Sequence, residues 1–192
     1  MSKRAELKNL EDEMAANAKL PLRGKANLVF GEGNINCKVM FIGEAPGKTE
    51  DLLKRPFVGR AGKLLDAMIQ ELGWKRADVY ITNIMKRRPP ENRDPLPKEL
   101  AAYKPYLTRQ IEIIEPKLIV TLGRFSMNYF APEAKMTRDH GRAILVGINM
   151  GKRKQAVFPV YHPAAALRST KMMATLRGDF KKIPNVLKKK PH

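Results

Sequence analysis

Residues 37–47 read Cys-Lys-Val-Met-Phe-Ile-Gly-Glu-Ala-Pro-Gly, and this stretch decides the fold. The mostly apolar residues 37–42 are typical of a short buried strand. Gly43, Pro46 and Gly47 then require a loop, because glycine and proline interrupt regular structure. A strand that runs into a glycine-rich loop and then into a helix is half of a βαβ unit, so the stretch predicts an α/β protein.

The rest of the chain repeats this alternation. Apolar residues at three- and four-residue spacing predict helices over residues 4–20, 60–72, 98–115 and 124–130, with a basic helix from residue 171. Short apolar runs predict further strands over residues 79–84, 117–122, 143–148 and 155–160. We expect an α/β sandwich with a mostly parallel sheet, formed by residues 1–192 as a single domain with a basic C-terminal tail at about 184–192.

The composition is strongly basic. The chain has 192 residues, with 37 Lys and Arg against 19 Asp and Glu and a formal net charge of +18. This charge favours a nucleic acid as partner, because phosphate neutralisation releases counterions. No apolar run reaches the roughly 18 residues of a membrane span, and the start lacks the apolar core of a secretory signal. We therefore predict a cytoplasmic protein without membrane contact, and a monomer.

Cysteine and histidine are scarce. The lone Cys37 excludes an intramolecular disulfide and a metal cage built from cysteines alone. The three histidines are too few and too scattered for a zinc motif. No metal site is predicted.

Three segments that directly follow predicted strands are rich in special residues: 43–47, 83–93 and 162–163. Loops at the carboxyl edge of an open α/β sheet converge on one crevice. Asn83 offers an amide that both donates and accepts, and His162 offers a hydrogen-bonding ring. The sequence therefore predicts a small polar pocket at this edge.

Motifs in this order and at this spacing resemble a known family. The residues that carry the resemblance are Gly43-Glu44-Ala45-Pro46-Gly47 with Glu50-Asp51, Arg55-Pro56-Phe57-Val58-Gly59-Arg60-Ala61-Gly62, Thr82-Asn83-Ile84, Lys86-x-Arg88-Pro89-Pro90-x-Asn92-Arg93 and His162-Pro163-Ala164. From about Asn17 to about Leu187 the chain resembles the uracil-DNA glycosylases of the iron-sulfur group, often called family 4. The resemblance implies a three-layer α/β/α sandwich with a central four-stranded, mostly parallel sheet. It also implies DNA repair by hydrolysis of the N-glycosidic bond of deoxyuridine. Lyase activity is not predicted, because no lysine is singled out as a Schiff-base nucleophile.

The resemblance assigns a uracil-binding role to Ala45, Glu50, Phe57 and Asn83. Phe57 matches the ring that stacks on the flipped base. Asn83 matches the reader of its Watson–Crick edge: the amide donates to O4 and accepts from the N3 hydrogen, whereas cytosine presents the opposite polarity. Taken alone, Asn83 would more often cap a strand end and Phe57 would more often pack in a core.

Two residues are expected to be catalytic. Glu44 takes the position that the resemblance associates with the catalytic water, where a carboxylate orients water or stabilises an oxocarbenium sugar. The alternative to a catalytic role is that the Glu44 carboxylate only organises the loop. His162 matches a donor to O2 of uracil, where negative charge develops as the base departs.

A third group is expected to bind DNA: Lys86, Arg88, Asn92, Arg93, Leu167 and Arg168. Leu167 is the candidate wedge that fills the space left by the flipped base. The basic runs 152–154 and 188–190 are interpreted as solvated charge that adds generic affinity.

The chain departs from the family where the resemblance places four cluster cysteines. Asn17, Leu20, Arg87 and Tyr103 stand at the matching positions, and none of them supplies a thiolate. We therefore predict that the protein has no iron-sulfur cluster and needs no cofactor. We hypothesise that packing of Leu20 and Tyr103, with hydrogen bonds from Arg87, braces the region instead.

Other functions remain open at this stage. The protein is alternatively a non-catalytic nucleic-acid-binding protein, or a glycosylase for another deaminated or mismatched base. A phosphate-binding NTPase is disfavoured, because residues 43–49 place three residues between the glycines where that loop needs four.

Overall fold

A computed structural model of the chain describes residues 1–148 and 153–188. The helices are α1 (Lys3–Ala16), α2 (Lys48–Leu53), α3 (Arg60–Glu71), α4 (Pro97–Ile114), α5 (Arg124–Phe130), α6 (Met136–Asp139), α7 (Pro163–Ala166), α8 (Thr170–Phe180) and α9 (Ile183–Lys188), with short 3-10 turns η1 (Arg76–Asp78) and η2 (Pro90–Asn92). The strands are β1 (Glu32–Gly33), β2 (Val39–Gly43), β3 (Tyr80–Asn83), β4 (Leu118–Leu122), β5 (Ile144–Ile148) and β6 (Arg153–Val160).

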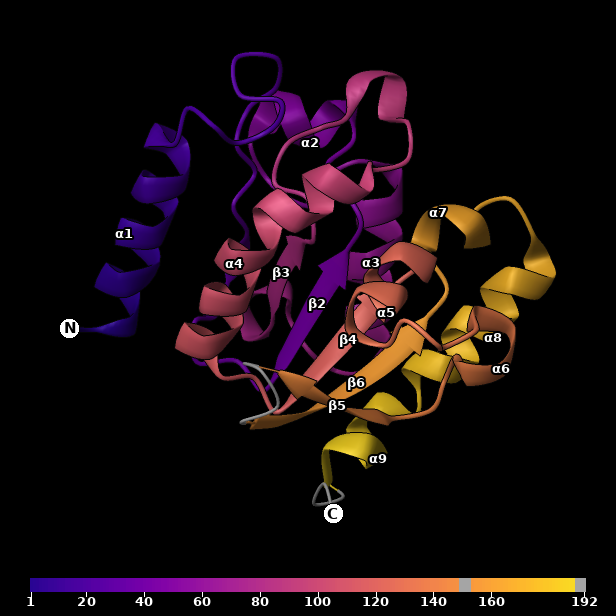
Figure 1. Cartoon of the computed structure of the whole chain (residues 1–192). Coiled ribbons are helices and arrows are strands. Elements are labelled where there is room, and N and C mark those ends of the chain that lie inside the picture. The colour runs from indigo at the N-terminus through magenta and orange to yellow at the C-terminus, as the bar shows by residue number, and fades with distance from the viewer. Residues whose placement is uncertain (149–152, 189–192) are drawn as a thin grey trace.

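The strands form one sheet in the order β1-β3-β2-β4-β6-β5 (Figure 1). The four central strands are parallel, with Phe41 of β2 aligned between Ile81 of β3 and Val120 of β4. This confirms the expected four-stranded parallel core. The short β1 and the strand β5 add antiparallel edges to it.

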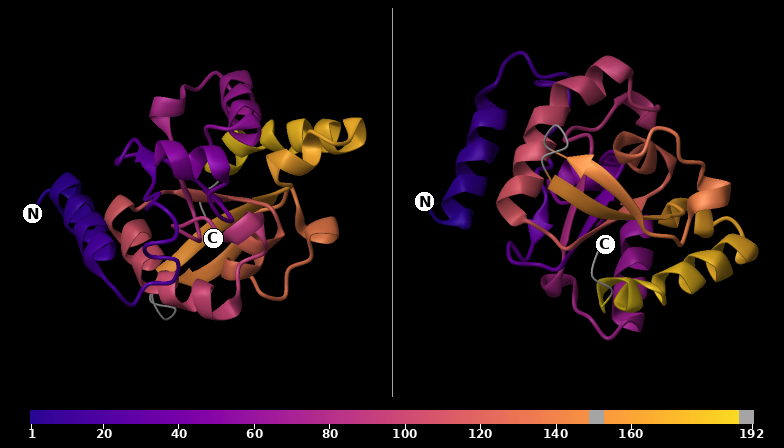
Figure 2. Two further views of the ribbon diagram at one scale, coloured as in Figure 1. Left: turned by 90° about the horizontal axis from the view of Figure 1, so that it is seen from above. Right: turned by 60° about the horizontal axis from the view of Figure 1, so that its bottom comes forward.

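Helices cover both faces of the sheet, which gives the three layers that the resemblance implied (Figures 1 and 2). Alternate residues of β2 point to opposite faces: Met40 and Ile42 pack toward α1 and α4, whereas Val39 and Phe41 pack toward α3 and α8. Because both faces are buried, the strand sequence is continuously apolar instead of alternating. In both views of Figure 2, α1 lies along α4 on the outside of its layer.

Three of the differences from the predicted elements have a clear physical reason. Helix α1 ends at Ala16, because Asn17 leaves helical geometry and its side chain binds Tyr106. Strand β1 has two residues and no apolar pattern, so the sequence did not reveal it. Part of the predicted basic tail is helix α9, anchored by the fully buried Ile183, while residues 189–192 lie outside the described part.

The fold brings the special segments together. Gly43 and Asn83 are the aligned last residues of neighbouring strands β2 and β3, and His162 follows the end of β6. Parallel strands end at one edge, so residues far apart in sequence meet there. Within the described ranges, no helix has the length and apolar character needed to cross a membrane.

Candidate active site

A cavity of about 390 Å³ opens at the carboxyl edge of the sheet. It is lined by Glu44, Ala45, Pro46, Gly47, Glu50, Phe57, Ala61, Asn83, Pro89, Asn92, Arg93, His162, Ala164 and Arg168. The structure thus brings together both expected catalytic residues, all four expected uracil-binding residues and three of the six expected DNA-binding residues. Lys86, Arg88 and Leu167 are not in the lining.

Gly43 packs against two of the residues that line the cavity. A Cβ atom at this glycine would overlap the Phe57 ring and lie 2.5 Å from Oδ1 of Asn83. Glycine is therefore required here because the Phe57 ring and the Asn83 amide both approach the backbone closely. The two side chains that the resemblance assigns to the base are neighbours across this point.

Asn83 is 1% exposed, and its Oδ1 atom has no hydrogen-bond partner among the described residues. A buried acceptor without a partner is costly, so native proteins rarely keep one without a reason. Asn83 lines the cavity together with Phe57 and His162. It is therefore free to accept a hydrogen bond from a ligand there.

His162 is positioned by the start of α7. Its Nδ1 accepts a hydrogen bond from the backbone N–H of Ala164 at 3.1 Å. Burial lowers the pKa of His162 to about 4, with the Glu50 carboxylate opposing the shift. The ring is therefore neutral at pH 7, and because Nδ1 accepts, the proton is carried by Nε2. Its ring centroid is 5.8 Å from that of Phe57.

Glu44 directly follows β2 and lines the cavity. Burial raises the pKa of Glu44 to about 7; the nearby Asp94 adds to the shift and Arg124 opposes it. A carboxyl whose pKa lies near 7 exchanges its proton readily at neutral pH. Such shifts are typical of catalytic carboxyl groups, although structural networks also produce them.

Glu50 organises the loop that carries Phe57. Its Oε1 accepts backbone hydrogen bonds from Val58 at 3.0 Å and from Gly59 at 2.7 Å. The carboxylate therefore closes the turn between α2 and α3. It lines the cavity as expected, but this oxygen is already engaged by the backbone.

The expectation that Lys86 binds DNA must be corrected. Lys86 is 0% exposed, and its Nζ donates to Oγ1 of Thr82, to Oε1 of Gln110 at 2.7 Å and to the Phe30 carbonyl at 3.2 Å. Burial lowers the pKa of Lys86 well below its ordinary value. The side chain faces the α4 layer, where a phosphate has no access. It ties β3 to α4 instead.

The remaining expected DNA-binding residues either line the cavity or are sequence neighbours of residues that line it. Arg88 donates to Oδ1 of Asn92 at 2.8 Å, and Arg93 forms a two-bond ion pair with Glu99 at 2.6 and 2.8 Å. Leu167 directly follows α7 and is 39% exposed. Arg168 is exposed beside it.

The four positions matching cluster cysteines meet between α4 and the segment after α1. Tyr103 donates to the Pro21 carbonyl at 2.6 Å, Asn17 binds Tyr106 at 2.8 Å, and Leu20 is buried in the same apolar cluster. Arg87 donates to the Ala26 carbonyl at 3.0 Å, and its guanidinium lies beside the Tyr103 hydroxyl. In the part of the chain that the structure describes, no group of three or more His, Cys, Asp or Glu side chains is arranged to hold a metal ion.

These residues do not fit an iron-sulfur cluster. Cluster iron needs thiolate ligands, whereas here a guanidinium, a phenol, an amide and a leucine occupy the region. The Nε of Arg87 is buried and has no partner within the described ranges. A cationic side chain at this point disfavours metal ions further.

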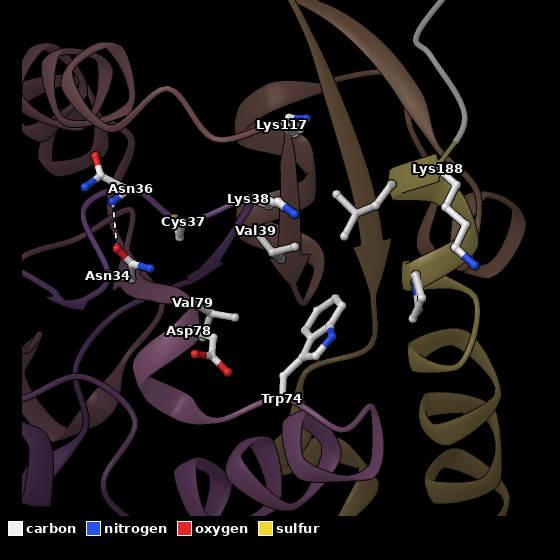
Figure 3. A pocket seen from close by; sticks show the side chains of 12 residues that line it. Asn34, Asn36, Cys37, Lys38, Val39, Trp74, Asp78, Val79, Lys117 and Lys188 are labelled. Atoms are coloured by element: carbon white, nitrogen blue, oxygen red, sulfur yellow. Dashed lines mark hydrogen bonds between the residues drawn. The ribbon is translucent and has the colours of Figure 1, made fainter.

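A second cavity, of about 530 Å³, lies at the opposite, amino end of the sheet (Figure 3). Trp74, Val39 and Val79 form its apolar walls, and Lys38 and Lys117 stand at its edge. It contains none of the residues expected to be functional. The carboxyl-edge cavity is therefore the candidate active site.

Sequence reasoning missed two contributors. Gly43 was recognised as a loop glycine, but its role as the close-approach point for Phe57 and Asn83 was not. Arg76, which binds the backbone of Phe57, gave no signal, because it lies 19 residues away in an ordinary basic turn.

The chain is similar in sequence to several known proteins. The family model described as the uracil DNA glycosylase superfamily matches residues 30–187. The type-4 uracil-DNA glycosylase of Saccharolobus solfataricus is 48% identical over 171 residues, which cover 87% of this chain and 79% of that protein. The type-4 enzyme of Archaeoglobus fulgidus is 44% identical, covering 86% of this chain and 85% of that protein, and that of Thermotoga maritima is 41% identical, covering 86% and 85%.

Proposed function

The chain belongs to the uracil DNA glycosylase superfamily, and from this premise we propose how it excises uracil from DNA. It is a monofunctional glycosylase that flips the deoxyuridine out of the helix and hydrolyses its N-glycosidic bond. The products are free uracil and an abasic site. The observation that carries the proposal is Asn83, which shares a cavity with Phe57 and His162 and whose Oδ1 has no hydrogen-bond partner among the described residues.

Asn83 selects the base. Its free Oδ1 accepts the N3 hydrogen of uracil, while its amide donates to O4. Cytosine has an acceptor at N3 and a donor at the 4-position, so both contacts would be mismatched in a closed site. Unpaired polar groups in such a site discriminate by orders of magnitude. Gly43 allows the flat base to reach this amide beside the Phe57 ring.

His162 stabilises the leaving base. Negative charge develops on O2 of uracil as the glycosidic bond breaks, and a fixed donor there lowers the barrier. Because Ala164 engages Nδ1, the Nε2 hydrogen is the available donor. The ring is neutral, since burial lowers the pKa of His162 to about 4, so it acts as a hydrogen-bond donor and not as a general acid.

Glu44 acts on the sugar from which the base departs. In its ionised form the carboxylate stabilises the oxocarbenium-like sugar or orients the attacking water. Its raised pKa of about 7 means that both protonation states are populated at neutral pH. Activity therefore depends on the ionised fraction of Glu44.

DNA is held around the cavity mouth by Arg88, Asn92, Arg93 and Arg168. Arg168 and Arg93 both line the cavity. Arg93 is partly exposed, and its ion pair with Glu99 orients its side chain. The exposed Leu167 acts as the wedge beside the extruded nucleotide. Its place directly after α7 keeps it near His162.

The protein works without an iron-sulfur cluster. The Tyr103 and Arg87 hydrogen bonds, together with the burial of Leu20, hold the segment after α1 against α4 in place of such a cluster. Assay of iron and acid-labile sulfide on anaerobically purified protein tests this. Stoichiometric iron and sulfide would contradict it.

The proposed enzyme has one domain, acts as a monomer and is located in the cytoplasm. Residues 1–192 act as that domain, and the cavity of this one chain holds every residue proposed for catalysis. A cytoplasmic location suits a DNA substrate and the unpaired, buried Cys37.

The test is release of uracil from an oligonucleotide with a single deoxyuridine, in which alkali cleaves the resulting abasic site. Wild type is compared with Asn83→Ala and His162→Ala, and with Asn36→Ala, which changes an exposed asparagine at the opposite end of the sheet. We expect release by wild type and by Asn36→Ala, and losses of roughly 100-fold or more in the two site variants. Absence of release by wild type on single strands, U:G pairs and U:A pairs would refute the proposal.

A further inference from the structure

Phe57 has an unusual backbone. Its φ is +50°, in the left-handed region that residues other than glycine rarely adopt. Such a conformation is strained and persists only where surrounding contacts impose it. Phe57 is also 5% exposed and lines the candidate active site. The orientation of the Phe57 ring is therefore determined by the contacts that fix the backbone of residues 56–59.

Arg76 holds one side of this segment. Its Nη2 donates to the Pro56 carbonyl at 2.5 Å, and its Nη1 donates to the Phe57 carbonyl at 3.1 Å. The other N–H groups bind acidic side chains: Nη1 donates to Asp66 at 2.7 Å, and Nε and Nη2 donate to Glu32 at 3.0 and 2.8 Å. All five donors of the guanidinium are used.

The acidic partners fix Arg76 from two different elements. Asp66 lies on α3 and Glu32 lies on β1, so the guanidinium is anchored to the helical layer and to the sheet edge at once. Burial alone would raise the pKa of Glu32, but hydrogen bonds from Arg55 and Arg76 outweigh it and lower that pKa. Glu32 is therefore ionised at neutral pH and attracts both arginines.

Other contacts hold the opposite side of the segment. Glu50 accepts the N–H groups of Val58 and Gly59. Gly62 lets α3 approach closely, because a Cβ atom there would overlap the backbone of Phe57. With Arg76 on the carbonyls, Glu50 on the following amides and α3 behind, the left-handed residue is enclosed.

We propose that Arg76 is a positioning residue for uracil excision, which holds the Phe57 ring in its stacking orientation through the Pro56 and Phe57 carbonyls. Arg76 is not in the cavity lining and acts only through Phe57. The inference rests on the proposed function, because it requires that a base stacks on Phe57. Lysine would not replace it, since one ammonium has three donors at a single point and lacks the planar fork.

The test is a double-mutant cycle between Arg76→Met and Phe57→Ala, with uracil excision measured under single-turnover conditions. In the Phe57 background, Arg76→Met should slow excision roughly 10- to 100-fold, because misplacement of a positioning group by about 1 Å has such effects. In the Phe57→Ala background no ring remains to be positioned, and the further loss should be less than about threefold. Thermal melting of all four proteins sets an assay temperature at which each is folded.

Arg55→Met is the matched control. Arg55 also pairs with Glu32, at 2.7 and 3.0 Å, but the structure gives it no bond to the Pro56 or Phe57 carbonyl. It should excise uracil within about twofold of wild type. If Arg76→Met does not fold, Arg76→Lys enters the same cycle and should show a smaller loss with the same dependence on Phe57.

The outcomes separate the two proposals. Equal losses from Arg76→Met in both backgrounds would mean a general structural role and would overturn the positioning inference, while uracil excision by wild type stands. A loss in Arg55→Met as large as that in Arg76→Met would overturn it as well. Failure of wild type to release uracil would overturn the proposed function and this inference together.

Discussion

Replacement of Glu44 by glutamine should stabilise the protein and inactivate it at the same time. The folded protein raises the pKa of this carboxyl from its ordinary value of 4.5 to about 7. Between these pH values the folded chain holds a proton that the unfolded chain releases, so folding stability falls as pH rises through this window. The loss of folding stability caused by ionised Glu44 is absent below pH 4.5 and complete above pH 7. A glutamine at this position cannot ionise, so the variant does not lose this stability.

The size of this cost follows from the two pKa values. Their difference corresponds to roughly 3 kcal/mol when converted in full. Glu44 borders an open cavity and is partly reached by solvent, so screening reduces the expected cost to about 1 to 2 kcal/mol. Glu44→Gln should therefore be more stable than wild type by about this amount at pH 8.5. The difference should be much smaller at pH 5.

Two measurements check this prediction. Denaturant unfolding of both proteins at pH 5 and 8.5 gives the stability difference, from which contributions of unchanged groups cancel. The single-turnover rate of wild type should rise through about pH 7 and level off above it, because the ionised carboxylate is the active form. Asp94→Asn should move this rise to lower pH, since Asp94 helps to raise the pKa of Glu44.

The reasoning would be refuted by a stability difference that does not change between pH 5 and 8.5. A flat activity profile across pH 7 in wild type would also contradict it, provided that the chemical step is rate-limiting. Full activity of Glu44→Gln would leave Glu44 as a residue that only organises its loop.

The other predictions concern the cavity, the DNA surface and the region without a cluster. Gly43→Ala should reduce excision at least about 100-fold and cost about 1 to 3 kcal/mol of stability, because the added methyl group overlaps the Phe57 ring; single-turnover rates and thermal melting check it. Lys86→Met should leave the salt dependence of DNA affinity unchanged, whereas Arg168→Met should reduce its slope by about one; binding titrations at several salt concentrations distinguish them. Tyr103→Phe should lower the free energy of unfolding by about 1 kcal/mol, because the bond to the Pro21 carbonyl is lost, and a chelator should leave wild-type stability unchanged.

Much of the fold was predictable because its elements carry local signals. The strand at 39–43 and the helix at 60–71 are encoded by an apolar run and by apolar spacing that a reader finds without coordinates. Strand β1 was not predictable, because its two residues pair through the backbone with β3 and have no pattern of their own. The helix α9 was also missed, since a basic composition hides the single buried anchor at Ile183.

The residues of the candidate site were also predictable in part. Motif order pointed to Glu44, Asn83 and His162, since each lies at or just after the end of a strand and the carboxyl ends of parallel strands must meet. It failed for Lys86, because a lysine next to other basic residues looks solvated until its hydrogen bonds to Thr82 and Gln110 are seen.

The sequence by itself determined the strand and helix pattern, the basic charge, the residue types at the carboxyl edge and the lack of cluster cysteines, because these depend on local order along the chain. Only the tertiary structure decided which side chains are buried, which atoms lack partners and which distant groups support the site. The lowered pKa of His162 and the raised pKa of Glu44 arise from burial by the folded chain, and the bonds from Arg76 to Phe57 join segments 19 residues apart. Burial and hydrogen bonding are properties of three-dimensional neighbours, and the spacing of residues along a chain does not contain them.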